Sequence, residues 1–237
     1  MYKYIILFKA SLLDIRNEWS WYLLLMLASP LSILFFLLVI VGDNIGLSTF
    51  ITGSVIMVLG TGVFLGLGQT LSMYKATGSL NYYLTFPLSR AAIMLSIMFR
   101  TVLLTLPSLI VLLIINSIIS QDRVYLGFPF FVSLVLTSTS LAGLGTIIGI
   151  TSKNMQVASI LTQIITPIMI YLAPVFYEQD RLPAFFRWLS YILPTTYASI
   201  SLRTALQTNM FSYATIVLAI VSIISIVYST VALDWRS

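Results

Sequence analysis

The sequence contains no histidine and no cysteine, and only 8% of its 237 residues are charged. A chain without cysteine forms no disulfide and has no thiol nucleophile, and a chain without either residue lacks the usual ligands of zinc. The absence of histidine also removes the side chain that most often serves as a general base. We therefore predict neither a catalytic residue nor a metal site.

Apolar residues are correspondingly abundant. They make up 59% of the chain, and the mean hydropathy is +1.03. An ordinary soluble domain has about 45–50% apolar and about 25% charged residues. Too few polar residues remain to cover a folded surface, so the composition excludes a water-soluble globule. The net charge of +5 then favours orientation in a membrane over binding to nucleic acid.

Six apolar runs, each about 20 residues long, have the length needed to cross a hydrocarbon core of about 30 Å. None has a charged residue at its middle, and none alternates as the strands of a membrane β-barrel do. The runs are Trp19–Val41, Phe50–Met73, Thr101–Ile119, Phe128–Thr151, Gln156–Phe176 and Phe211–Leu233. Because a helix satisfies its own backbone hydrogen bonds in lipid, the sequence predicts an all-α polytopic membrane protein with one transmembrane domain over residues 1–237.

Lysine and arginine collect on one side of the predicted spans. That side holds Lys3, Lys9, Arg16, Lys75, Arg90, Arg100, Lys153 and Arg236. The other side holds Arg123, Arg181, Arg187 and Arg203, balanced by Asp43, Asp122, Glu178 and Asp180. The positive-inside rule makes the first side cytoplasmic. Six spans then place both termini in the cytoplasm and the protein in the cell membrane.

The first 18 residues have the pattern of an amphipathic helix. Apolar residues recur every three or four positions from Ile5 to Trp19, and Lys9 and Arg16 flank that stripe. Such a helix lies on a membrane surface with its cations near anionic headgroups. The alternative is a frayed polar terminus. At the third span, Arg100 is expected at the interface, with Ala91–Phe99 continuing the helix before it.

Two connecting segments are longer than a turn requires. The inner one covers residues 74–90, and the outer one covers residues 177–210. The outer segment contains Pro183 and Pro194, and its apolar residues from Leu182 to Leu189 have helical spacing. Proline breaks a helix, so we expect short helices that dip into the outer membrane face rather than a seventh span.

The glycine-rich run Gly60–Gly68 does not fit a nucleotide-binding motif. Leu65 stands where a dinucleotide fingerprint requires glycine, and no strand precedes the run. Gly62 with Gly66, and Gly145 with Gly149, instead form the spacing that allows close packing of membrane helices. The sequence also lacks a P-loop, and its spans lack the ionisable groups that ion-driven carriers use. Energy for uphill transport would therefore come from another chain.

The inner segment resembles the cytoplasmic signature of the permeases of type-2 ATP-binding-cassette (ABC) transporters, approximately E-x-E-x-G-T-L-E-x-L-x-x-T-P-L-S-R. The matching residues are Gly78, Leu80, Leu84, Pro87, Leu88, Ser89 and Arg90. The outer segment is similar to a second signature of the same family, through Pro183, Leu189, Pro194, Thr196, Tyr197, Leu202 and Arg203. The chain departs from the first signature at its acidic positions, which are Tyr74, Ala76 and Asn81 here.

This resemblance implies a half-transporter. Two permease subunits would pair as a homodimer or a heterodimer within membrane lipid. Each would dock one cytoplasmic ATP-binding subunit, which would hold the ATP and magnesium. A coupling helix would seat in that subunit, and its residues would be Lys75, Gly78, Leu80, Tyr82, Tyr83, Leu84, Phe86, Pro87 and Arg90. The uncharged aromatic character of this loop also favours a protein partner, and the alternative is an aromatic anchor among lipid headgroups.

The resemblance further implies a substrate path along the first, second and fifth spans. The neutral polar residues in those spans are Ser29, Ser32, Thr52, Thr61, Gln69, Gln163 and Thr166. The expected function is an exporter permease for an amphipathic or hydrophobic substrate. The alternatives are a secondary carrier or channel without an ATPase, and a membrane scaffold or immunity protein that transports nothing.

Overall fold

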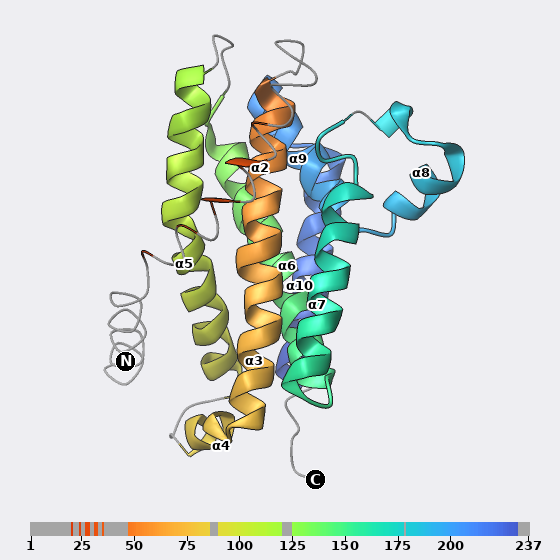
Figure 1. The fold of residues 1–237 in the computed structure, drawn as a ribbon. Helices are drawn as coiled ribbons and strands as arrows, with labels where there is room; N and C mark the ends of the chain where they lie inside the picture. Colours follow the sequence, from red (N-terminus) through yellow and green to blue (C-terminus); the bar gives the residue numbers. More distant parts are fainter. Residues whose placement is uncertain are drawn as a thin grey trace.

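The computed structural model describes residues 47–85, 90–119, 125–177 and 179–231, together with isolated helical positions between 20 and 35. Every regular element within these residues is a helix, and the helices form a bundle (Figure 1). The amphipathic helix predicted over residues 1–18, nearly all of the span Trp19–Val41, and the site residues Ser29, Phe86 and Pro87 lie outside the described residues.

The central column of the bundle is one continuous helix in three parts. Helix α2 covers Leu47–Leu59, the π-helix η2 covers Gly60–Leu65, and α3 covers Gly66–Ala76. Of the three described helices long enough to span a membrane, this column is the most buried, since it packs between α5, α6 and α7 (Figure 1). The predicted span Phe50–Met73 lies within it. The π-turn was not predicted from the sequence.

Gly78 turns the chain out of this column. Its φ of 72° lies in the left-handed region, which glycine adopts without strain. Helix α4, Ser79–Leu84, follows at one end of the bundle, here named the α4 end (Figure 1). Helix α5 then runs over Arg90–Ile119 with Pro107 inside it. The helix expected to continue before Arg100 is therefore present.

Helix α6 begins and ends at the residues that the hydropathy pattern gives, Phe128–Thr151. Helix α7 covers Met155–Tyr171, and the Asn154 side chain accepts a hydrogen bond from the Val157 N–H at its start. The predicted span Gln156–Phe176 extends five residues beyond the C-terminal end of α7. The helix stops before Pro174 because proline has no N–H to continue the hydrogen-bond ladder.

Short elements follow α7 toward the opposite end of the bundle, here named the α8 end (Figure 1). They are the 3₁₀ turn η3, Gln179–Arg181, and α8, Ala184–Ser190. Helix α9, Pro194–Thr208, is longer than expected, and Pro194 starts it rather than breaks it. Proline is well tolerated at the first helical position. Helix α10, Tyr213–Val231, completes the bundle.

Glycine and hydroxyl residues allow the helices to pack closely. A Cβ on Gly145 of α6 would overlap the carbonyl oxygen of Phe64, and one on Gly149 would lie 2.8 Å from that of Gly68. The predicted Gly145–Gly149 pair thus lies at a backbone contact with η2 and α3. On the other side of α6, Ser225 lies against Gly143, and Ser229 donates to the Gly143 carbonyl at 3.4 Å.

Among the described residues, three helices are long and apolar enough to cross a membrane: Ser48–Ala76, Ala92–Ile115 and Phe128–Thr151. Two shorter apolar helices, Met155–Tyr171 and Tyr213–Ser229, accompany them. These five helices correspond to the second through sixth apolar runs of the sequence.

Candidate functional site

Helix α4 is seated on the bundle through one face and exposed on the other. Leu80 is only 4% exposed and belongs to the hydrophobic core, whereas Tyr82 is 65% exposed. The Thr77 and Ser79 hydroxyls hydrogen-bond each other at 2.8 Å across Gly78. Of the predicted coupling residues on α4, Tyr82 therefore lies on the exposed face, whereas Leu80 packs inside the chain.

Two further residues near this loop contact neighbouring helices. Lys75 donates from Nζ to the Ile150 and Ser152 carbonyls at the end of α6, at 3.1 Å and 3.0 Å. Arg100 of α5 donates from Nη1 to the Tyr74 hydroxyl at 3.0 Å. The sequence indicated a coupling role for Lys75 and an interfacial position for Arg100, but neither contact was predicted.

The outer signature residues hold the connection between α7 and α9. The Arg203 Nη2 lies 3.2 Å, 3.3 Å and 3.4 Å from the carbonyl oxygens of Pro174, Val175 and Tyr177, and donates to them. The Thr195 hydroxyl donates to the Met169 carbonyl at 2.6 Å. The Thr195 bond satisfies a carbonyl in the last turn of α7, which has no partner within the helix, and the Arg203 bonds hold the chain that follows α7.

The other signature residues shape the same connection. Pro183 precedes α8 as its N-cap, Pro194 starts α9, and Tyr197 is half-buried against the core. The Tyr177 hydroxyl donates to the Tyr171 carbonyl at 2.6 Å, and burial raises the pKa of this phenol above its usual value of 10.0. Tyr177 is therefore a neutral donor at physiological pH.

The predicted path residues divide into two groups. The hydroxyls of Ser32, Thr52, Thr61 and Thr166 each donate to a carbonyl four residues earlier on their own helix. The two amides instead share one acceptor. Gln69 of α3 and Gln163 of α7 both donate from Nε2 to the Ser159 hydroxyl, at 3.2 Å and 2.8 Å. Ser159 was not predicted, although its position four residues before Gln163 places both on one helical face.

The amide pair has hydrogen-bonding capacity left to contact a ligand. Gln163 is exposed on the bundle surface within a helix of apolar residues. Among the described residues, each amide makes a single side-chain hydrogen bond, whereas an amide offers two donor hydrogens and an acceptor oxygen. A polar group at this depth is costly against lipid, so this face of α7 fits contact with protein or with a water-filled path.

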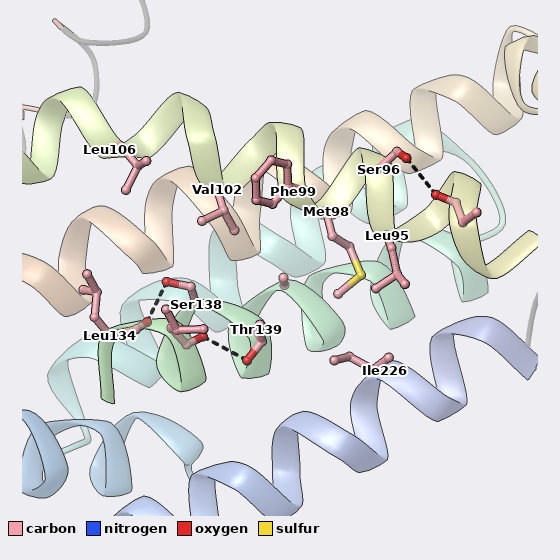
Figure 2. A pocket seen from close by; sticks show the side chains of 13 residues that line it. Leu95, Ser96, Met98, Phe99, Val102, Leu106, Leu134, Ser138, Thr139 and Ile226 are labelled. Atoms are coloured by element: carbon pink, nitrogen blue, oxygen red, sulfur yellow. Dashed lines mark hydrogen bonds between the residues drawn. The ribbon is translucent and has the colours of Figure 1, made fainter. Parts of the chain in front are cut away.

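An apolar groove of about 740 Å³ lies elsewhere, between α5, α6 and α10 (Figure 2). Its lining includes Leu95, Phe99 and Val102, and it contains none of the predicted path residues. The hydroxyls of Ser96, Ser138 and Thr139 donate to carbonyls of their own helices (Figure 2). The groove therefore presents hydrocarbon to whatever lies in it.

Comparison with known proteins assigns the chain to a family. Residues 2–207 match the model of the ABC-2 type transporter family. The chain belongs to this family. A search of curated proteins found no match. As an ABC-2 membrane domain it is the permease component of an ABC transporter and a multi-pass membrane protein, and family members normally work with an ATP-binding subunit.

The family match extends over both signatures, since residues 74–90 and all of the outer segment up to Gln207 lie inside it. In this ABC-2 permease the two signatures lie at opposite ends of the bundle, one in α4 and one around α8 and α9 (Figure 1). The buried column of α2, η2 and α3 connects these two ends. Ser48 at the start of α2 is hydrogen-bonded to Gln207 of α9 at 2.9 Å, and the end of α3 leads into α4.

Proposed function

We propose that this chain is the permease subunit of an ABC exporter whose α4 docks a separate cytoplasmic ATP-binding subunit. The observation that carries the proposal is the short helix α4, which stands at the end of the bundle with Tyr82 65% exposed. ATP and magnesium bind in the partner. The nucleotide states of the partner bias the paired permeases between inward-open and outward-open forms through differential affinity.

The test is co-purification from gently solubilised membranes. The tagged permease is expected to bring down one ATP-binding subunit with a P-loop per permease, in a complex that hydrolyses ATP. A permease that purifies in good yield without such a subunit argues for a secondary carrier, a channel or a scaffold instead.

Tyr82→Asp is expected to reduce recovery of the ATP-binding subunit about tenfold, because exposed aromatic residues dominate interface energies. The control is Met155→Asp, which replaces another exposed large side chain, 44% exposed, at the start of α7, where the helix dipole tolerates an acid. Recovery is measured by quantitative blotting at equal permease yield. Equal recovery by the two variants would contradict docking through α4.

A second permease copy, identical or related, is proposed to cover the exposed face of α7. Ile160, Gln163 and Ile164 lie on this face, and pairing would shield the Gln163 amide from lipid. The substrate path would then run between the copies, past Gln69 and Gln163. A path with neutral amides and no charge favours an amphipathic or hydrophobic substrate.

The α4 end is proposed to be cytoplasmic, with both termini on the same side. Single cysteines are easily interpreted because the sequence has none of its own. Thr85→Cys is exposed near α4, and the Asp180 side chain is 95% exposed near α8. In intact cells, a membrane-impermeant maleimide is expected to label Asp180→Cys and to label Thr85→Cys only after permeabilisation. The opposite pattern would reverse the orientation.

A further inference from the structure

Two adjacent residues at the end of α3 fasten this helix to two different neighbours. Tyr74 receives a hydrogen bond of 3.0 Å from Arg100 of α5. Lys75 donates hydrogen bonds of 3.1 Å and 3.0 Å to two carbonyls at the end of α6. Three residues after Lys75, Gly78 turns the chain into α4. Any displacement of α4 thus reaches α3 at the point where α3 is tied to α5 and α6.

The Lys75 contact has the chemistry of a helix cap. Helix α6 ends at Thr151, so its last carbonyls have no partner within the helix. The Lys75 ammonium group satisfies one of them, that of Ile150, together with the carbonyl of the C-cap residue Ser152, and lies at the negative end of the helix dipole. The Lys75 side chain is half-buried here, so solvent screens these bonds less than it screens a surface pair.

The crossing of α3 and α6 next to this cap is tightly packed. A Cβ on Gly149 would lie 2.8 Å from both the Gly68 carbonyl oxygen and the Leu71 Cβ, so α3 and α6 touch without intervening side chains. Closely packed contacts of this kind transmit displacement rather than absorb it. The cap and the crossing together make α3 and the end of α6 one mechanical unit.

We propose that Tyr74 and Lys75 are positioning residues that transmit movement of α4 to α5 and α6 together, a role that rests on the docking of α4 proposed above. Lys75 then acts within the permease and is not a contact of the ATP-binding subunit. Tyr74 acts as an acceptor for Arg100. It stands at a position where the family signature has an acid, and a carboxylate also accepts from a guanidinium group.

The experiment uses the permease with its ATP-binding subunit in lipid nanodiscs. Each variant also carries Asp180→Cys as a reporter at the α8 end, and the maleimide labelling rate is measured with and without ATP and magnesium. Lys75→Met is expected to recover the ATP-binding subunit normally but to reduce the ATP-dependent change in labelling about tenfold, since it removes two charge-assisted hydrogen bonds. Lys75→Arg should retain the change.

Lys153→Met is the matched control, because Lys153 is an exposed lysine just beyond the same end of α6. It should leave recovery and labelling unchanged. Loss of subunit recovery in Lys75→Met would overturn the proposal, because Lys75 would then be a docking contact. An unchanged ATP response in Lys75→Met would overturn it as well.

The tyrosine provides an independent pair of variants. Tyr74→Phe removes the acceptor and should weaken the ATP response, whereas Tyr74→Glu supplies a carboxylate and should retain it. Equal responses from these two variants would refute the role of Tyr74. If Lys75→Met yields no folded protein, this pair still decides the matter.

Hydrogen exchange tests the Lys75 cap on α6 separately from the docking of the ATP-binding subunit. In the permease alone, Lys75→Met should accelerate exchange of the Ser152 amide, which bonds the Ile148 carbonyl at 3.0 Å, about tenfold, and Lys153→Met should not. No acceleration would refute the cap whatever the partner does. Absence of any ATP-binding subunit from the wild-type preparation would refute the docking instead.

Discussion

Gly145→Leu is expected to lower the stability and yield of folded permease strongly. A Cβ at this position would overlap the carbonyl oxygen of Phe64, and a backbone atom has no alternative rotamer. Helix α6 would have to move away from η2, which would open the most buried contact of the bundle. Such overpacking costs about 3 kcal/mol, a large part of the stability of a typical domain. The measurement is the yield and thermal stability of detergent-solubilised protein by fluorescent size-exclusion chromatography.

Gly66→Ala is the control, since Gly66 is also a helical glycine but lies in α3 of the central column. A Cβ there would meet only the Thr101 Cγ2 at 3.8 Å and the Thr61 carbonyl oxygen at 4.0 Å, which are ordinary van der Waals distances. Alanine also has the higher helix propensity, by about 1 kcal/mol. Gly66→Ala should therefore be as stable as the wild type or more so. Similar losses in the two variants would show that glycine is needed for flexibility rather than for close approach.

Arg203→Met is expected to destabilise the α8 end of the protein by about 3 kcal/mol. The substitution preserves most of the apolar stem but leaves the Pro174, Val175 and Tyr177 carbonyls without the Arg203 donor. A buried acceptor that loses its partner costs about 1–3 kcal/mol. Thermal unfolding in detergent and limited proteolysis after α7 are the measurements, and faster cleavage there is the expected signature.

Arg187→Met provides the comparison. The Arg187 guanidinium donates to the Asp180 and Leu182 carbonyls at 2.9 Å and 3.3 Å and lies 3.7 Å from the Asp180 carboxylate. The two side chains are 38% and 95% exposed, so water can replace the ion pair. Exposed ion pairs contribute less than about 1 kcal/mol. A loss of stability in Arg187→Met that equals the loss in Arg203→Met would contradict the bracing role of Arg203.

The sequence predicts helices well where a single physical rule controls them. The apolar run Phe128–Thr151 coincides with α6, because Gly127 and Pro129 mark its start and polar residues follow Thr151 directly. The close approach at Gly145 also follows from local spacing of small residues. The hydropathy pattern misplaces the end of α7, because apolar residues continue to Phe176, beyond Pro174.

The contacts of the candidate sites depend on distant parts of the chain and leave little trace in local sequence. Gln69 and Ser159 are separated by 90 residues, and Lys75 and Ile150 by 75. Hydropathy identifies Lys75 as an end-of-span cation but cannot name the carbonyls that it meets. The resemblance implies that Thr52 and Thr166 line a path, and in the structure their hydroxyls donate to carbonyls of their own helices. A threonine in a span is therefore weaker evidence for a substrate path than a glutamine, because a hydrogen bond within its own helix already accounts for its hydroxyl.

The π-turn at Gly60–Leu65 ties the register of the central column to its length. A π-turn closes hydrogen bonds five residues apart instead of four, so it holds one residue more than an α-turn in the same place. If the same residues were wound as a regular α-helix instead, every side chain from Gly66 to Ala76 would be rotated by about 100°. Gly68 would no longer face α6, and Gln69 would no longer face α7. The column therefore accommodates one residue more than a regular α-helix of the same length, and a deletion within Gly60–Leu65 would disturb these contacts less than a deletion elsewhere in the column.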